Sequence, residues 1–296
     1  LRDSAGSLRQ ASGLAPSLLL PAMRQTAAVH VLLAGLAALV VASVAPSPVP
    51  LLDYEVVSRR AHDTAAYTQG LLLDDAGRLF ESTGRWGESD LREVDPASGE
   101  VLRLRPSPDE LFSEGLALVG DELIQLSWRA GLAQRFDVDS FELLGSHAYA
   151  GEGWGLCYDG QRLVMSDGSS QLIFRDPHTF AAIGSVDVTV GGVPVPRLNE
   201  LECVDGEVWA NVWLTDAIVR IDPHDGRVNG VLDLDGILVP HPAETESGAV
   251  LNGIAYDPAA DTFLVTGKLW PELIEIRVSE PIAPADPPAE PAEPPE

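Results

Sequence analysis

Lysine is nearly absent from this chain of 296 residues, which has 45 acidic residues, 19 basic residues and a net charge of −26. Its one lysine is Lys268, and every other basic residue is arginine. A nucleic-acid partner would require a basic face that neutralises phosphates, and the sequence has no such stripe. The acidity instead suits solubility outside the cytoplasm or a weak attraction for the cationic N-termini of peptides.

Cysteine is scarce too, since the chain has only Cys157 and Cys203. Two cysteines do not define a disulfide framework, and each lies in an apolar, strand-like run, so the sequence favours buried free thiols. No CxxC pair or Cys/His cluster indicates zinc.

Long hydrophobic runs are also missing, because the strongest one, residues 31–42, has only 12 residues and is short for a membrane span. It follows Arg24 and precedes Ser43-Val44-Ala45, so residues 23–45 are interpreted as a signal peptide or signal anchor. Residues 1–22, before Met23, are interpreted as a non-native or mis-assigned leader. We therefore expect a secreted or periplasmic protein that contacts a membrane only through an uncleaved anchor. Residues 280–296, with seven prolines and five acids, are expected to form a disordered tail.

Glycine and proline, by contrast, are plentiful, at 27 and 23 residues, and they favour turns between short strands. Residues 51–279 contain five similar segments, each with an apolar strand, a turn and a second strand. A β-turn solenoid is the structural alternative, but its repeats are usually shorter, so we predict an all-β, five-bladed β-propeller. The repeats are spaced by 45, 40, 45 and 53 residues at Gly70, Gly115, Gly155, Glu200 and Gly253.

The residues just before these repeat positions are mostly polar, although they are expected to line the central channel. A buried polar group without a partner costs about 1–3 kcal/mol, so a ring of them favours a binding site. The loops after the second strands add Trp128, Trp213 and Lys268, which suggests an aromatic cleft with convergent polar groups. The residues of the first ring are Gln69, Glu114, Trp154, Asn199 and Asn252.

The motifs at these positions resemble the plant and bacterial, papaya-latex type of glutaminyl-peptide cyclotransferases. The resemblance covers about Tyr54 to Val278 and implies a five-bladed propeller that converts N-terminal glutamine to pyroglutamate. Tyr67 stands where the family more often has phenylalanine. The matching segments include Tyr67-Thr-Gln-Gly-Leu71, Phe112-Ser-Glu-Gly-Leu116, Gly151-Glu-Gly-Trp-Gly-Leu156, Leu198-Asn-Glu-Leu-Glu202, Ala210-Asn-Val-Trp213 and Thr266-Gly-Lys-Leu-Trp-Pro271.

The resemblance implies roles for these residues in an intramolecular aminolysis. Glu114 would carry a proton from the substrate amine to the leaving amide, while Lys268 and Asn199 stabilise the oxyanion. The remaining residues would bind the substrate, a peptide or protein with N-terminal glutamine. The scheme needs no metal or other cofactor, and we expect a monomer. These substrate-binding residues are Gln69, Tyr67, Phe112, Trp128, Trp154, Trp213 and Asn252.

Two other functions remain open at the level of sequence. The same ring could belong to a non-catalytic propeller that binds peptides or cell-wall fragments. It could also hold calcium in a lactonase-like hydrolase, for which Glu114, Asn199 and Asn252 would be a thin set of ligands.

Overall fold

The computed structural model describes residues 49–240 and 248–281, and within these ranges the chain is all-β, with no helix. Among these residues there is accordingly no helix that could span a membrane. The interpretations of residues 1–22 and 23–45 lie outside the described ranges, as does that of the tail 280–296 except for its first two residues.

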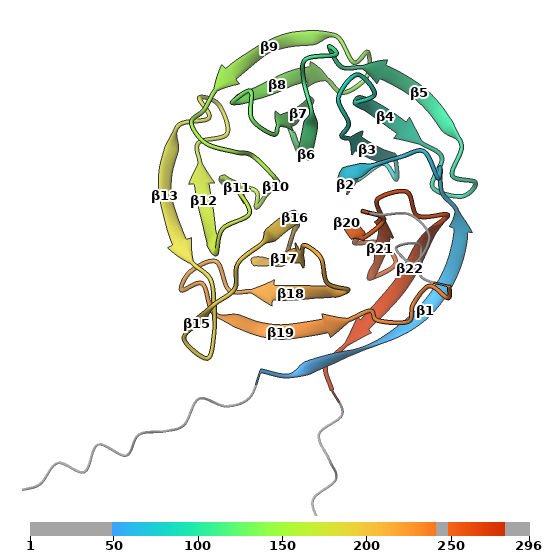
Figure 1. The fold of residues 1–296 in the computed structure, drawn as a ribbon, viewed down its shortest axis with the longest axis vertical. Helices are drawn as coiled ribbons and strands as arrows, with labels where there is room; N and C mark the ends of the chain where they lie inside the picture. Colours follow the sequence, from blue (N-terminus) through green and yellow to red (C-terminus); the bar gives the residue numbers. More distant parts are fainter. Residues whose placement is uncertain (1–48, 241–247, 282–296) are drawn as a thin grey trace, which may run out of the picture. The chain divides into compact units, whose positions relative to one another are not determined.

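Three sheets of four antiparallel strands follow one another along the chain and surround a central axis (Figure 1). The first strand of each sheet lies nearest the axis and the fourth lies on the outside, which makes the fold propeller-like. These strands are β2 (Thr68–Leu73), β3 (Leu79–Thr83), β4 (Asp90–Val94) and β5 (Val101–Pro106), then β6 (Ser113–Val119), β7 (Glu122–Ser127), β8 (Leu132–Asp137) and β9 (Leu143–Ala148), then β10 (Leu156–Tyr158), β11 (Leu163–Met165), β12 (Gln171–Arg175) and β13 (Ala182–Asp187).

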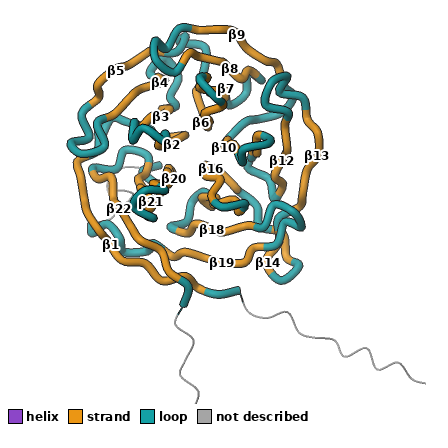
Figure 2. Tube along the Cα trace, turned by 180° about the vertical axis from the view of Figure 1, so that it is seen from behind, coloured by secondary structure: helices purple, strands orange, loops and turns teal. Residues whose placement is uncertain are grey.

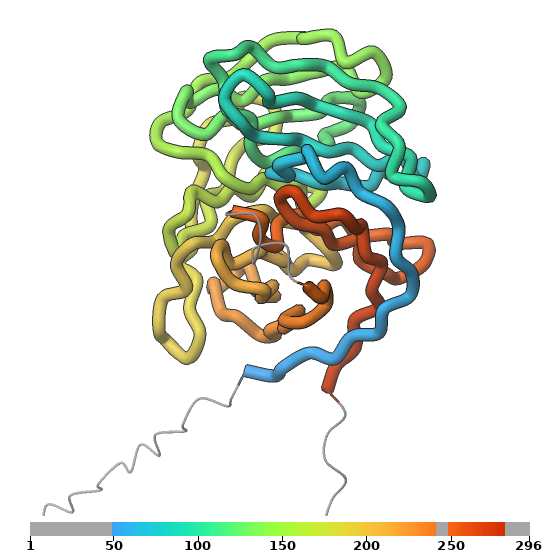
Figure 3. The backbone as a smooth tube through the Cα atoms, turned by 45° about the vertical axis from the view of Figure 1, so that its right-hand side comes forward, coloured from blue at the N-terminus to red at the C-terminus, as the bar shows by residue number. Residues whose placement is uncertain are grey.

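The rest of the ring is an eight-stranded sheet, and a small two-stranded hairpin lies in the chain between the third four-stranded sheet and this one. The sheet has the order β16-β17-β18-β19-β1-β22-β21-β20, and β1 joins its two halves by pairing parallel to β19 and antiparallel to β22. Figure 3 shows this N-terminal strand, in blue, beside the C-terminal strand, in red. The strands are β1 (Leu51–Ala61), β14 (Thr189–Val190), β15 (Val193–Pro194), β16 (Leu198–Val204), β17 (Glu207–Val212), β18 (Ala217–Ile221), β19 (Val228–Asp233), β20 (Leu251–Asp257), β21 (Thr262–Gly267) and β22 (Glu272–Ser279).

The repeat glycines are explained by the close approach of the inner strands, which surround the axis in Figure 2. A Cβ atom added to Gly115 would lie 2.5 Å from the Leu156 nitrogen, and one added to Gly155 would lie 2.0 Å from the Asn199 carbonyl oxygen. Glycine is therefore required where neighbouring inner strands touch. Apolar clusters fill the space between the sheets; one combines Phe80 of the first sheet with Phe136 of the second.

The expectation of two free thiols is wrong, because Cys157 and Cys203 form a disulfide. The two cysteines are 46 residues apart, close to one repeat length, so they lie on the neighbouring inner strands β10 and β16 with their Cα atoms 5.5 Å apart. That separation suits a disulfide, and the bond links two adjacent sheets.

Candidate active site

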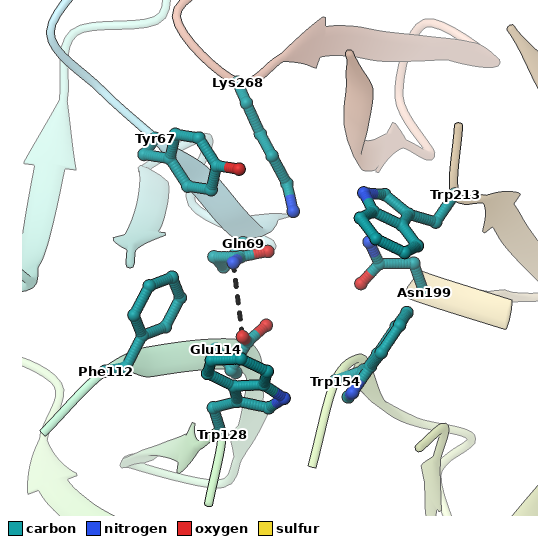
Figure 4. A pocket seen from close by; sticks show the side chains of 9 residues that line it. All are labelled: Tyr67, Gln69, Phe112, Glu114, Trp128, Trp154, Asn199, Trp213 and Lys268. Atoms are coloured by element: carbon teal, nitrogen blue, oxygen red, sulfur yellow. Dashed lines mark hydrogen bonds between the residues drawn. The ribbon is translucent and has the colours of Figure 1, made fainter. Parts of the chain in front are cut away.

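A pocket of about 150 Å³ lies at the end of the axis where the inner strands begin (Figure 4). Its lining contains nine of the ten residues that the sequence singled out, drawn from all the sheets of the ring. The tenth, Asn252, does not line the pocket. The lining residues are Tyr67, Gln69, Phe112, Glu114, Trp128, Trp154, Asn199, Trp213 and Lys268.

Irregularities in the inner strands present the polar side chains to the pocket. The pairing register of β2 with β3 shifts around Gln69, that of β6 with β7 around Glu114, and that of β16 with β17 around Asn199. Such bulges bend a strand and redirect a side chain that regular alternation would place elsewhere. Trp128 and Lys268 come from the loops just after β7 and β21, above the same opening.

Glu114 and Lys268 are the two ionisable groups buried deepest in this lining, with exposures of 5% and 4%. Burial raises the pKa of the Glu114 carboxyl well above its ordinary value, the Lys268 charge opposes that shift, and the Glu152 charge adds to it. Burial also lowers the pKa of Lys268 to about 8, and here Glu114 opposes the shift. A weakly acidic carboxyl beside a weakly basic amine is suited to proton transfer near neutral pH.

The amide side chains differ in the hydrogen bonds that they make within the protein. The Gln69 Nε2 donates to Glu114 Oε1 at 3.2 Å. The buried Asn199 Oδ1 has no hydrogen-bond partner among the residues that the structure describes. Asn252 instead lies buried behind Gln69, where its Nδ2 donates to the Thr68 carbonyl oxygen at 2.9 Å and to Gln69 Oε1 at 3.4 Å. Asn252 therefore supports Gln69 and does not contact the pocket.

Aromatic rings in edge-to-face pairs form the walls. Trp154 and Trp213 meet with centroids 5.5 Å apart at 88°, and Phe112 and Trp128 meet at 5.5 Å and 60°. Such pairs hold rigid apolar surfaces in place. Room for them depends on Gly168, because a Cβ atom there would lie 2.5 Å from the Trp154 ring.

Sequence reasoning missed two residues at this site. Glu152 accepts hydrogen bonds from the indole nitrogens of Trp128 and Trp154, at 2.8 and 3.0 Å. Trp86, which is 55% exposed, packs edge-to-face on Phe112 with centroids 5.6 Å apart and extends the aromatic wall outward. Glu152 lies two residues before Trp154, just as Tyr67 and Phe112 lie two residues before Gln69 and Glu114, so the repeat alignment could have indicated it. Trp86 lies outside the repeat positions considered in the sequence.

Within the described ranges, no group of three or more His, Cys, Asp or Glu side chains is arranged to hold a metal ion. The side chains that line the pocket supply one carboxyl, one amine, two amides and an aromatic enclosure.

Known proteins are similar to this chain in both sequence and fold. Residues 28–278 match the glutamine cyclotransferase family. A glutaminyl-peptide cyclotransferase of Arabidopsis thaliana is 40% identical over 230 residues, which are 77% of this chain and 72% of that relative. The crystal structure of Myxococcus xanthus glutaminyl cyclase superposes with a TM-score of 0.74 at 38% identity, covering 79% of this chain and 100% of that one.

The fold, the site and these matches define an enzyme of the acyltransferase class on a propeller-like, all-β scaffold. The chain belongs to the glutamine cyclotransferase family.

Proposed function

We propose that the pocket converts the N-terminal glutamine of peptides or proteins to pyroglutamate, with Glu114, Lys268 and Asn199 as its catalytic residues. The chain is a glutaminyl-peptide cyclotransferase, as its family and its relatives indicate. The observation that carries the residue assignment is the convergence of a buried acid, a buried amine and the buried amide of Asn199 inside one aromatic pocket.

The reaction joins two atoms of the same residue. The α-amino nitrogen attacks the γ-carboxamide carbon, a five-membered lactam closes, and the carbon–nitrogen bond to the amide nitrogen breaks to release ammonia. The enzyme must therefore hold the side chain curled, with nucleophile and electrophile in contact. Trp128, Trp154 and Trp213 enclose a narrow space suited to that conformer.

Glu114 moves the proton. Attack requires a neutral amine, and departure of ammonia requires a proton on the leaving nitrogen. A carboxylate that takes a proton from the first nitrogen and delivers it to the second satisfies both requirements. The raised pKa of Glu114 makes its carboxylate a stronger base than an exposed glutamate.

Lys268 and Asn199 stabilise the oxyanion of the tetrahedral intermediate. The Lys268 ammonium and the Asn199 amide NH₂ can donate to that oxygen, and removing one such donor typically costs about 2.7–4 kcal/mol. Gln69 orients the substrate amide and is itself held by Glu114 and Asn252. Tyr67 and Phe112 complete the wall, with centroids 6.4 Å apart.

The scaffold for this site is a five-bladed β-propeller. The eight-stranded sheet counts as two blades of four strands, β16 to β19 and β20 to β22 with β1 as the outer strand, which are joined where β1 pairs with β19. With the three other four-stranded sheets this gives five units, in agreement with the five sequence repeats. We further propose export through residues 23–45, peptide or protein substrates and no nucleic-acid partner, and a monomeric enzyme.

Release of ammonia from a peptide with N-terminal glutamine tests the function. A matched peptide that begins with asparagine is the control, since its amine would have to close a strained four-membered ring. We expect ammonia and pyroglutamate from the first peptide only. A pocket that merely binds peptides would release none, and a calcium-dependent hydrolase would lose its activity on chelation.

A further inference from the structure

Glu152 connects two walls of the pocket through a single oxygen atom. Its Oε2 accepts a hydrogen bond from the Trp128 Nε1 at 2.8 Å and another from the Trp154 Nε1 at 3.0 Å. Trp128 follows β7, whereas Trp154 precedes β10 on the next sheet. An indole nitrogen can only donate, so the shared acceptor fixes the edges of the two rings relative to each other.

The other oxygen of Glu152 is bound as well. Arg129 donates its Nε–H to Oε1 at 2.9 Å, and its guanidinium carbon lies 3.7 Å from the centroid of the Trp128 ring. Arg129 thus covers one face of Trp128 while Glu152 holds its edge. These three donors hold the pKa of Glu152 below its ordinary value, in spite of partial burial, so the bridge carries a negative charge at neutral pH.

An exposed acid paired with one arginine would need no functional explanation, since such pairs contribute little. The arrangement of Glu152 differs because its acceptor atom serves two substrate-binding rings. Trp128 and Trp154 also enclose part of the pocket. An apolar residue at position 152 could not hold the two rings in place, because it would have no hydrogen-bond acceptor.

We propose that Glu152 is a positioning residue of the cyclisation reaction, which sets the spacing between the Trp128 and Trp154 indoles and thereby the slot for the glutamine side chain. The proposal rests on the proposed function and adds a residue to its machinery. Glu152 itself does not line the pocket. It acts through the two rings, and small displacements of positioning groups are costly in reactions that depend on a curled substrate.

Two substitutions separate the acceptor from the charge. Glu152→Gln keeps a side-chain oxygen that can accept from both indoles, whereas Glu152→Ala removes it. With a Gln-Gly peptide amide, we expect Glu152→Ala to raise KM about tenfold with a smaller change in kcat, and Glu152→Gln to keep KM within about twofold. In both variants the acid limb of the kcat profile should move to lower pH, because the Glu152 charge raises the pKa of Glu114.

Glu122→Ala is the matched control. The Glu122 side chain has a similar exposure, 31% against 35%, and a similar arginine partner, Arg135, but it lies at the far end of β7 and does not line the pocket. Its KM and pH profile should match wild type. Trp128→Phe supplies a second approach: it keeps a ring but removes the donor, so adding Glu152→Ala to it should raise KM less than in wild type.

An unchanged KM in Glu152→Ala would overturn the proposal, as would equal damage from Glu152→Gln. A wild-type enzyme that releases no ammonia would instead contradict the proposed function itself.

Discussion

The two ends of the inner strands show opposite designs. The pocket occupies the end where the strands begin, and there the amide oxygen of Asn199 is buried without a partner in the described structure. A second cavity, of about 550 Å³, lies where the strands end, and its lining contains the Cys157–Cys203 disulfide and Glu202. The first end thus holds a buried amide oxygen without a partner, whereas at the other end a disulfide joins two sheets.

The carboxyl groups of Glu114 and Glu202 illustrate the difference between the two ends. Burial raises the pKa of Glu202 to about 8 and also raises that of Glu114, so the shift alone does not distinguish them. Glu202 accepts a hydrogen bond from the Tyr256 backbone nitrogen at 3.0 Å, whereas Glu114 faces Lys268 across a pocket. A shifted pKa therefore marks a catalytic acid only where a cavity and a charged partner accompany it.

The same substitution at the two ends tests this contrast most severely. Glu114→Gln should lower kcat by about 10³-fold, because an amide cannot accept and return the proton. The melting temperature should hardly change, since glutamine keeps the shape of the side chain. Glu202→Gln should leave turnover within about twofold of wild type. Comparable losses of turnover in the two variants would contradict the contrast. Ammonia release and thermal melting measure both effects.

Lys268 is expected to follow Glu114 in size of effect. Lys268→Ala should lower kcat by about 10²- to 10³-fold through loss of an oxyanion donor. It also leaves Glu114 without the nearby positive charge, so the Glu114 carboxyl should be protonated up to a higher pH. Arg277→Ala, at an exposed arginine of β22, is the control for loss of one positive charge and should keep wild-type kinetics.

At the opposite end, removing the disulfide should change stability and leave catalysis intact. Replacing Cys157 and Cys203 together by serine frees a loop of 46 residues, which should cost about 2–4 kcal/mol of unfolding free energy. At roughly 2–4 °C per kcal/mol, the melting temperature should fall by roughly 4–16 °C. Turnover at 25 °C should be unchanged; a variant with lost activity and unchanged melting would reverse the assignment of roles.

The sequence predicted the pocket because sequence repeats place equivalent residues at equivalent points around the central axis. Equivalent positions in successive units share a distance from the axis, so Gln69, Glu114 and Asn199 could be placed together without coordinates. The same logic would have found the disulfide, since Cys157 and Cys203 differ by about one repeat. The number of cysteines alone does not indicate the bond, whereas their separation of one repeat does.

Other features depend on contacts that repetition does not encode. Asn252 occupies an equivalent position but lies behind Gln69, because its side chain finds acceptors there. Glu152 occupies the same repeat position as Tyr67 and Phe112, but its link to two indoles follows from the direction of their N–H groups in space, which the repeat does not encode. Periodicity therefore located the strands and the ring, and the hydrogen bonds around them required the structure.

The smallest expected effect is the pH dependence of kcat, which tests the roles of Glu114 and Lys268 in the pocket most directly. Turnover should rise with pH as Glu114 loses its proton, at a pH above the ordinary range of a glutamate, because the base must be ionised. It should fall again near pH 8, where Lys268 loses the proton that the oxyanion needs. Lys268→Arg should retain part of the activity and lose the alkaline limb, since a guanidinium stays protonated there. A wild-type profile that stays flat to pH 10 would show that the Lys268 charge is not required, and the oxyanion would then depend on Asn199 alone.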